Sequence, residues 1–468
     1  MKTFSIDTLG CKVNQYESQQ VRELLERLGL SQIRTCERPD LVVINTCCVT
    51  GTASAKSRQR IRRAGKLSPG AVIIACGCLP SIRTAELNNP TESVRIIRHR
   101  TRLAVELAQI VQGKTTASCP TASHACPHSY IKPQMADEIK YKKNLVAVPQ
   151  LMALKAFKGH TRAFIKVQDG CDGCCSYCIV PKTRSVLSSR PSEMVIREAR
   201  DLVAAGHKEI VLTGVFIGAY GQESVRRTNW PNGNNEKLAL LLEQVSQIPG
   251  LSRIRLSSLE PADVTPRLLD TFCRCRNIMP HLHLSLQSGS DTVLERMCRQ
   301  YGRDDFRSTI GLIKDRLDRP AITTDLIVGF PGETDTDFEQ TMELASEAGF
   351  AKIHVFSFSA RPGTAAAKMQ DVVDKRVVKR RSAILRQLDR ELGYEFRQQF
   401  VGQPAEVLVE DDGQMPAGRT ERYFKVRIHP NGHIYQKNQL VRVELTANSA
   451  DAAMGRVINN AGGCNKPA

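Results

Sequence analysis

Three cysteines near the middle of the chain stand in an order that suits an iron–sulfur cluster. Cys171, Cys175 and Cys178 follow the pattern Cys-x-x-x-Cys-x-x-Cys, shortly after the apolar run 163–167. A loop of this length can hold three corners of an iron–sulfur cube, which leaves the fourth iron with an open coordination position. Such a cluster can bind a small chelating ligand as well as carry an electron.

Two other uses of these cysteines agree less well with their spacing. With Cys174 counted, the loop holds two Cys-x-x-Cys pairs, but structural zinc sites usually separate such pairs by about 15–20 residues. Disulfides of an exported protein are disfavoured too, because the first residues do not form a targeting segment and the chain is far longer than a disulfide-stapled module. We therefore predict a cluster with Cys174 as an unliganded neighbour.

The composition indicates an intracellular protein with a polyanionic partner. The 468 residues suffice for two to four domains. No apolar run approaches the roughly 18–20 residues of a membrane span. Sixteen cysteines without an export signal favour a reducing compartment, so we expect a cytoplasmic protein. The net charge of +18 favours a polyanion such as nucleic acid, although a charge excess is often only a solvated surface.

The amino-terminal part has the pattern of an open parallel α/β sheet. Residues 3–9 alternate like a strand, and the apolar runs 41–44 and 71–75 are typical of buried parallel strands. Residues 19–28 carry apolar side chains at helical spacing. Each of the three predicted strands is followed by a thiol.

These thiols predict a second three-cysteine site. Cys11, Cys47 and Cys78 follow equivalent strand ends, and the carboxyl ends of parallel strands share one crevice. A single strand-end cysteine is often only a core residue, but three at equivalent ends are harder to explain in that way. The spacing alone does not decide between Cys47 and Cys48 or between Cys78 and Cys76, so Cys48 and Cys76 stay open as alternatives.

From residue 161 onward, apolar runs alternate with helical segments, which is the signature of repeated β-α units around a parallel sheet. Six such units predict a partial (β/α)6 barrel. The predicted strands are 163–167, 209–212, 253–256, 281–286, 322–328 and 352–356. Sites on such folds lie at the carboxyl ends of the strands. The segments found there are the Cys171 loop and residues 213–214, 257–260, 287–290 and 329–334.

The motifs resemble the methylthiotransferase family of radical S-adenosylmethionine (SAM) enzymes. The Cys171 loop has the spacing of the radical SAM motif, with Tyr177 as the aromatic residue before its last cysteine. The amino-terminal matches are Thr8-Leu9-Gly10-Cys11-Lys12-Val13-Asn14-Gln15-Tyr16-Glu17-Ser18, Asn45-Thr46-Cys47 and Gly77-Cys78. The central matches are residues 282–289 and 325–334. The resemblance spans nearly the whole chain, and the Cys11 motif is closest in form to the branch that acts on threonylcarbamoyladenosine next to the tRNA anticodon.

The resemblance implies two 4Fe-4S clusters and SAM as cofactors. A purine C–H bond has no useful acidity, so exchanging hydrogen for sulfur needs a radical route that the cofactors provide. The implied ligands of the cluster that splits SAM into a 5'-deoxyadenosyl radical are Cys171, Cys175 and Cys178. Those of the auxiliary cluster that delivers a methylated sulfur are Cys11, Cys47 and Cys78. The expected SAM contacts are Tyr177, Thr213, Gly214, Glu260, Gln287 and Gly329. No catalytic residue beyond the cluster ligands is predicted.

Two segments are candidates for RNA binding. Residues 55–66 hold six basic and no acidic residues, which would give a helix a positive face for phosphate groups, although each residue alone could belong to a solvated surface. Beyond residue 401 the pattern changes to period two, as in a small antiparallel β-barrel, and this tail resembles the TRAM domain of the family. Tyr423 could stack on bases or equally belong to the core. The candidate contacts are Lys56, Arg58, Arg62, Arg63, Arg419, Arg422, Tyr423 and Lys425.

The predicted domain boundaries follow from these patterns. Residues 1–112 form the amino-terminal sheet domain, 113–160 a linker, 161–400 the radical SAM domain and 401–468 the TRAM-like RNA-binding domain. Four residues of the linker have metal-binding side chains, but their spacing fits no standard site. They are Cys119, His124, Cys126 and His128.

The function that the resemblance implies is insertion of a methylthio group at carbon 2 of N6-threonylcarbamoyladenosine in tRNA. The same chemistry on isopentenyladenosine tRNA or on a ribosomal protein side chain stays open. An alternative from a different functional class is an RNA-binding protein whose clusters only stabilise the fold. A purely structural cluster, however, would normally have four protein ligands. The expected partners are the tRNA anticodon loop, SAM, a reductant and a sulfur donor, with no membrane.

Overall fold

The computed structural model describes residues 1–82, 94–113, 151–229, 236–430 and 432–458, which form two compact units. Unit 1 comprises Met1–Gly10, Glu17–Cys47 and Ser54–Ala153. Unit 2 comprises Cys11–Tyr16, Cys48–Ala53 and Leu154–Ala468. Each unit is described by itself below.

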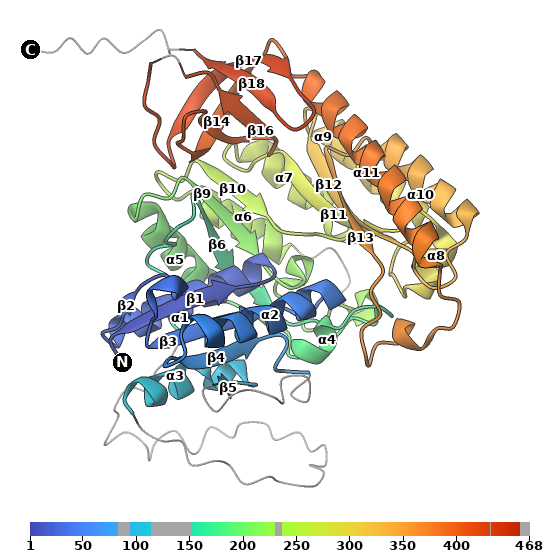
Figure 1. Cartoon of the computed structure of the whole chain (residues 1–468). Coiled ribbons are helices and arrows are strands. Elements are labelled where there is room, and N and C mark those ends of the chain that lie inside the picture. The colour runs from blue at the N-terminus through green and yellow to red at the C-terminus, as the bar shows by residue number, and fades with distance from the viewer. Residues whose placement is uncertain (83–93, 114–150, 230–235, 431, 459–468) are drawn as a thin grey trace, which may run out of the picture. The chain divides into compact units, whose positions relative to one another are not determined.

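Unit 1 contains a five-stranded parallel sheet in the order β2-β1-β3-β4-β5 (Figure 1). Its strands are β1 (Thr3–Thr8), β2 (Ser31–Gln32), β3 (Leu41–Thr46), β4 (Val72–Gly77) and β5 (Val94–Ile96). The helices of this region are α1 (Lys12–Arg27), α2 (Gly51–Leu67) and α3 (Leu103–Val111), and the first residues of α1 and α2 belong to unit 2. The three predicted strands are confirmed; the short strands β2 and β5 carry too little apolar pattern to have been predicted.

Helical spacing explains how these helices are buried. In α2, Ser57, Ile61 and Ala64 are buried, whereas the basic residues lie on the other faces. Residues that recur every three or four positions share one helix face, so the small and apolar residues face the protein while the charged ones stay hydrated. The unit's core includes Phe4, Leu25, Leu41, Val43, Ile74 and Leu107.

Unit 2 is built around six parallel strands that form a partial barrel. They are β6 (Arg162–Lys166), β9 (Glu209–Thr213), β10 (Arg253–Leu256), β11 (His281–Gln287), β12 (Ala321–Val328) and β13 (Lys352–Ser357). They pair as β10-β9-β6 and β11-β12-β13, and the isolated parallel bridges Ile254↔Ile278 and Leu259↔Leu284 join the two groups. All six predicted strands are confirmed, with ends that differ by at most one residue.

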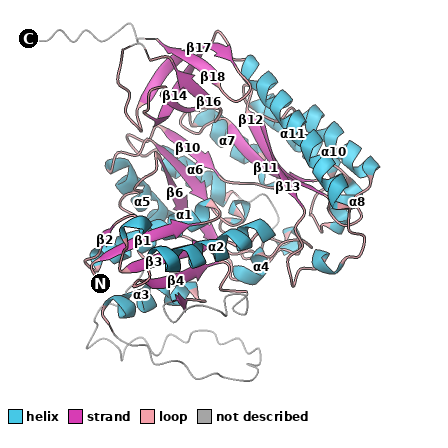
Figure 2. Cartoon of the chain, in the orientation of Figure 1, coloured by secondary structure: helices cyan, strands magenta, loops and turns pink. Residues whose placement is uncertain are grey.

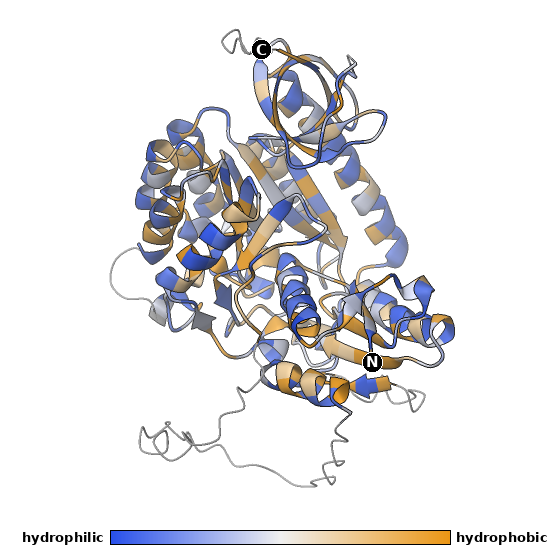
Figure 3. Ribbon diagram, turned by 90° about the vertical axis from the view of Figure 1, so that its left-hand side faces the viewer, coloured by the Kyte–Doolittle hydropathy of each residue, from blue (hydrophilic) through white to orange (hydrophobic). Residues whose placement is uncertain are grey.

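Helices and short elements complete this part of unit 2 (Figure 2). The helices are α4 (Val180–Thr183), α5 (Ser192–Ala204), α6 (Lys237–Ser246), α7 (Pro266–Arg274), α8 (Asp291–Arg296), α9 (Arg303–Arg316), α10 (Asp335–Ala348) and α11 (Lys375–Gln398). The strands β7 (Gln168–Asp169) and β8 (Ser188–Ser189) form a separate antiparallel pair. In Figure 3 the helices carry hydrophilic and hydrophobic residues along the same length, as expected for helices with one buried face.

The alternation along β11 places two kinds of side chain on its two faces. Leu282, Leu284 and Leu286 are buried in the main hydrophobic core together with residues of the surrounding helices. Successive strand residues point to opposite faces, so His281, His283 and Ser285 lie on the concave face. That face carries the polar chemistry described below.

The carboxy-terminal part of unit 2 is a closed five-stranded barrel in the order β14-β15-β16-β18-β17. Its strands are β14 (Pro404–Asp411), β15 (Ala417–Thr420), β16 (Lys425–Ile428), β17 (Leu440–Asn448) and β18 (Ala453–Val457). The pair β16–β18 is parallel and the other four pairs are antiparallel. Closure removes the free strand edges of so small a sheet. The predicted three-part fold class is confirmed.

Two fully buried arginines connect this small barrel to the larger one. Arg253 donates to the backbone carbonyl of Glu406 at 2.6 Å, and Arg255 donates to that of Thr420 at 2.8 Å. The buried carboxylate of Glu209 accepts from Arg255 at 2.9 Å, which offsets part of the cost of burying the charge.

Candidate active site

The three cysteines at the centre of the prediction lie in the loop between β7 and α4. Cys171, Cys175 and Cys178 are half-buried, whereas Cys174 is exposed and its thiol contacts the Cys298 carbonyl at 3.8 Å. The Cys178 N–H donates to the Cys175 carbonyl at 3.1 Å, which tightens this end of the loop. Cys174 thus differs from the other three thiols in its exposure.

Glycine and hydrogen bonds fix the path of this loop. Gly170 has a φ of 81°, and a Cβ there would come within 1.9 Å of the Val186 carbonyl oxygen, so only glycine fits. After it, the Cys171 N–H donates to the Arg184 carbonyl at 2.9 Å. The Asp172 carboxylate accepts from Ser224 at 2.6 Å and from the Val225 N–H at 2.7 Å. These contacts position the first cysteine independently of any metal.

Arg299 links the thiols to two neighbouring polar groups. Its Nη1 lies 3.2 Å from the Cys175 Sγ, and its Nη2 donates to Glu260 Oε1 at 2.6 Å. Both the Arg299 and Glu260 side chains are less than one-tenth exposed (6% and 8%). Burial raises the pKa of Glu260, while Arg299 and Arg227 oppose that rise. Glu260 Oε2 accepts no hydrogen bond from the described residues and has only Arg227 Nη2 at 3.6 Å.

The thiols are poorly suited to ionise without a cation among them. Burial raises the pKa of Cys171 to about 12 and that of Cys178 to about 11, and in both cases the neighbouring thiols add to the effect. Burial also raises the pKa of Cys175, although Arg299 opposes it. An iron–sulfur cluster supplies the missing positive charge, so the donor set fits that group.

A cavity of about 150 Å³ adjoins the cysteines, and several of the predicted SAM contacts line it. Tyr177, Glu260 and Gln287 line it together with the thiols. Thr213, Gly214 and Gly329 do not belong to its described lining; the Gly329 N–H donates to Glu333 at 3.0 Å. Gln287 has a φ of 69°, a conformation that costs free energy in a non-glycine residue and often marks a functional site.

Sequence reasoning missed Arg299 and Ser285, which also line this cavity. Arg299 comes from the segment after α8, far from any cysteine motif. A lone arginine in a chain with 66 basic residues carries no local signal. Ser285 could have been found, because it stands two residues before Gln287 on the same strand and therefore on the same face.

In unit 1, two of the predicted amino-terminal cysteines follow neighbouring parallel strands. Thr46 at the end of β3 pairs with Gly77 at the end of β4, so Cys47 and Cys78 emerge side by side. Arg100 Nη2 lies 3.2 Å from the Cys78 Sγ and pairs with Glu17 at 3.8 Å. The third cysteine, Cys11, comes three residues after the end of β1, the next strand of the sheet.

Cys76 differs from Cys78 in its surroundings. It lies within β4, belongs to the hydrophobic core of unit 1, and its thiol contacts the Ile44 carbonyl at 3.7 Å. Burial raises its pKa to about 12. A thiol committed to the core in this way is a packing residue, which favours Cys78 at this doublet.

The segment that carries Cys11 is tied into unit 2 by two buried polar contacts. Asn14 accepts from Arg184 Nη2 at 3.1 Å, and Arg184 also pairs with Asp169 at 2.7 Å, just before the Cys171 loop. The Tyr16 hydroxyl donates to Glu198 at 2.9 Å. The motif around Cys11 thus contains residues that anchor the chain as well as the cysteine itself.

The predicted RNA contacts fall into two structural groups. In α2, Lys56, Arg62 and Arg63 are exposed and Arg58 is half-buried. Arg58, Arg62 and Arg63 line a hollow of about 490 Å³ together with Lys66. These basic groups are therefore presented together on one side of the helix.

The group in the small barrel is largely engaged in internal contacts. The Tyr423 ring lies 4.5 Å from Arg419, 4.9 Å from Arg255 and 5.0 Å from Arg162, measured from ring centroid to guanidinium carbon. Arg422 pairs with Asp318 at 3.0 Å. Lys425 is exposed.

Cys119, His124, Cys126 and His128 lie outside the described residues. Within the described ranges, no helix has both the length and the apolar character needed to cross a membrane.

Comparisons with known proteins agree with this arrangement. Residues 165–345 match the radical SAM superfamily, and residues 3–98 match the uncharacterized protein family UPF0004. Over 95% of this chain and 97% of the relative, the sequence is 35% identical to the threonylcarbamoyladenosine tRNA methylthiotransferase MtaB of Bacillus subtilis. The corresponding values for the protein of that name from Chlamydia pneumoniae are 34%, 97% and 98%.

A relative with a different printed substrate is also similar. The tRNA-2-methylthio-N(6)-dimethylallyladenosine synthase of Pelotomaculum thermopropionicum is 32% identical over 89% of both chains. Among solved structures, the radical SAM methyltransferase TsrM from Kitasatospora setae, with cobalamin and a [4Fe-4S] cluster bound, has a TM-score of 0.53 at 16% identity and covers 86% of this chain and 76% of its own. That likeness supports the fold alone.

Proposed function

This chain belongs to the methylthiotransferase family of radical SAM enzymes, and from that premise we propose that it inserts a methylthio group at carbon 2 of N6-threonylcarbamoyladenosine next to the tRNA anticodon. The observation that carries the proposal is the presence of two separate three-cysteine sets in a chain similar to such enzymes over nearly its full length. One set adjoins a cavity, and the other follows three neighbouring strands.

We assign the two cluster sites by chemistry and position. Cys171, Cys175 and Cys178 hold the first cluster, and Cys11, Cys47 and Cys78 the second. When bound, the clusters supply the electron for reductive cleavage of SAM and the sulfur that is transferred. No fourth thiol is assigned to either set, so each cluster keeps a position for a ligand that is not a cysteine.

The residues around the cavity bind SAM and hold the ligands of the first cluster in position. Glu260 Oε2, a buried acceptor without a hydrogen bond, suits the ammonium group of SAM. Arg299 holds the other Glu260 oxygen and the Cys175 sulfur in fixed positions, so the carboxylate and the cluster ligand keep one geometry. The Tyr177 ring closes part of the cavity and packs against Phe330, with ring centroids 6.5 Å apart.

The exposed basic face of α2 suits the phosphate backbone of tRNA. Removing two of its charges in Arg62→Gln/Lys66→Gln should weaken tRNA binding. The slope of the logarithm of the binding constant against the logarithm of the salt concentration should become shallower by about 0.7–0.9 for each phosphate group that is no longer neutralised. The matched control is Lys375→Gln/Lys379→Gln on α11, which removes the same charge from exposed positions. Equal effects in both variants would show that only the net charge matters.

The reaction also needs an electron donor and a source of sulfur. We place the protein in the cytoplasm with its tRNA substrate. The proposal is tested by mass spectrometry of tRNA nucleosides from cells with and without the protein. Loss of 2-methylthio-N6-threonylcarbamoyladenosine, with its unmodified precursor accumulating, is the expected result. Loss of the methylthio form of isopentenyladenosine instead would reassign the substrate, and unchanged nucleosides would contradict the function.

A further inference from the structure

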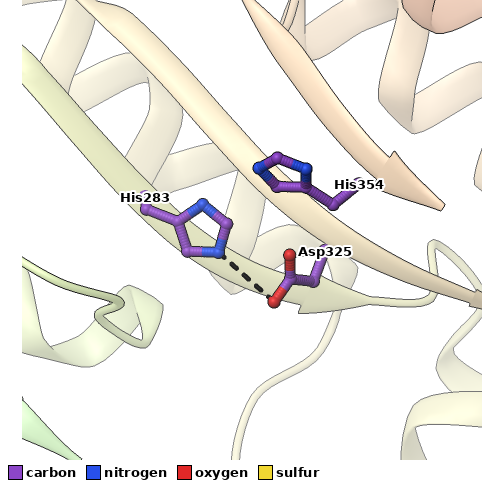
Figure 4. A group of neighbouring side chains, drawn as sticks. All are labelled: His283, Asp325 and His354. Carbon is purple, nitrogen blue, oxygen red and sulfur yellow. Dashed lines mark ion pairs between the residues drawn. The ribbon is translucent and has the colours of Figure 1, made fainter. Parts of the chain in front are cut away.

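Two histidines and an aspartate, none of them next to an assigned cysteine in the sequence, converge on the concave face of unit 2 (Figure 4). His283 is on β11, Asp325 on β12 and His354 on β13. One potential ligand atom from each residue lies within 4.8 Å of the other two. The three side chains therefore surround one point in space.

The strand register brings these residues together. Asp325 is the direct neighbour of His354 across β12–β13, and Thr323 is the direct neighbour of His283 across β11–β12. Thr323 and Asp325 are two residues apart and therefore face the same side of the sheet. All three residues thus occupy neighbouring positions on adjacent strands of one sheet. Residues on a rigid sheet hold metal ligands in position more accurately than residues on loops do.

The orientation of the rings suits metal coordination. Thr323 Oγ1 lies 2.9 Å from His283 Nδ1, which leaves His283 Nε2 facing Asp325 Oδ2 at 3.4 Å. That separation is too long for a good hydrogen bond. His354 is exposed and has no hydrogen-bond partner among the described residues, so its ring nitrogens are accessible to an ion.

A cavity of about 600 Å³ adjoins the cluster and leaves room for further ligands. Its lining includes His283 and His354 and also the cationic side chains of Lys12, Arg390 and Lys425, which form no ion pair with the described residues. Asp389 is already paired with Lys352 at 2.5 Å and does not offset the remaining charge. An ion at the cluster would therefore favour an anionic ligand, such as a carboxylate, from the cavity.

We propose that His283, Asp325 and His354 form a site for one divalent transition-metal ion, with its remaining coordination positions open to the cavity. Two imidazoles and one carboxylate are a donor set for zinc or iron(II). Thr323 orients His283 from the second layer, as metal-binding histidines commonly require. The proposed sulfur transfer does not use this ion, so the site goes beyond that function.

The test uses the full-length protein with both clusters loaded. After anaerobic dialysis against Zn²⁺ and removal of free metal, zinc and iron are measured by elemental analysis. Wild type should retain about one zinc more than Asp325→Asn and His354→Gln, at equal iron content. His433→Gln, at an exposed histidine of the small barrel, is the matched control and should behave like wild type.

A milder variant keeps the proposal testable if a ligand change disturbs the fold. Thr323→Val retains all three ligands but removes the hydroxyl at His283, and it should weaken zinc binding by about 10–100-fold in competition with a chromogenic chelator. Equal zinc content in wild type and the Asp325 and His354 variants would overturn the proposal, because zinc binding would then not depend on these side chains. Unchanged affinity in Thr323→Val would likewise count against it.

Discussion

The two three-cysteine sets are built in opposite ways. Cys171, Cys175 and Cys178 come from one short loop whose path is fixed by Gly170 and local hydrogen bonds. Cys47 and Cys78 come from two strand ends that only the sheet register makes neighbours. The first set is specified by spacing, whereas the second depends on the fold of unit 1 around it.

Their surroundings differ as well. The Cys171 set adjoins a cavity, and its nearest cation, Arg299, is buried and paired with the buried Glu260. The arginine beside Cys78, Arg100, is 23% exposed and lies 3.8 Å from Glu17. A buried pair costs more to break than a partly hydrated one. The difference suggests that the first site holds a small molecule rigidly, while the second relies on the sheet.

The largest expected effect comes from removing one thiol of the loop. Cys175→Ala should lower reductive SAM cleavage by more than about 100-fold, beyond the usual effect of changes around a metal site. The measurement is 5'-deoxyadenosine formation after anaerobic cluster reconstitution. Cys174→Ala, one residue away and exposed, should retain both iron and cleavage activity. Cleavage at the wild-type level in Cys175→Ala would remove the basis for the assignment.

The second test separates the two sets. The triple variant Cys11→Ala/Cys47→Ala/Cys78→Ala should bind about one cluster instead of two, cleave SAM and leave tRNA without the methylthio group. Iron and sulfide are measured on the same preparations, because Cys48 could replace a missing ligand. Loss of SAM cleavage with the Cys171 cluster intact would instead mean that the second cluster feeds electrons to the first.

The contrast also explains what could be predicted from the sequence. All six strands of the partial barrel were predicted because continuous apolar runs bounded by turns are a local signal. The choice between Cys76 and Cys78 required the fold, since Cys76 lies within β4 and packs in the hydrophobic core of unit 1, whereas Cys78 follows the end of that strand. Arg299 required the tertiary fold, because nothing near it in sequence is unusual. Tyr423 was predicted either to bind RNA or to belong to the core, and the three arginines that surround its ring could be found only from the tertiary fold.

A third test measures how much the buried ion pair between Arg299 and Glu260, beside the Cys171 loop, contributes to the stability of the protein. Arg299→Met leaves the Glu260 carboxylate buried with only Arg227 nearby, and such a change typically costs about 3–5 kcal/mol. The thermal midpoint of the cluster-loaded protein should fall by roughly 5–10 °C. Adding Glu260→Gln should recover part of the stability, because the uncompensated charge is then gone. No recovery would show that poorer packing, and not charge, causes the effect.

The smallest effect is expected at the corresponding arginine of unit 1. Arg100→Met removes an ion pair at 3.8 Å from a side chain that water reaches, and such pairs contribute about 0–1 kcal/mol. The thermal midpoint should therefore shift by no more than about 2–4 °C. Arg102→Met is the matched control, since Arg102 is more exposed and pairs with Glu106 at 3.3 Å along one turn of helix. Iron content should stay at the wild-type level in both variants, because neither removes a thiol. A fall as large as that of Arg299→Met, with iron released from Arg100→Met alone, would show that the interaction between Arg100 and the Cys78 sulfur supports the second cluster as firmly as Arg299 supports the first.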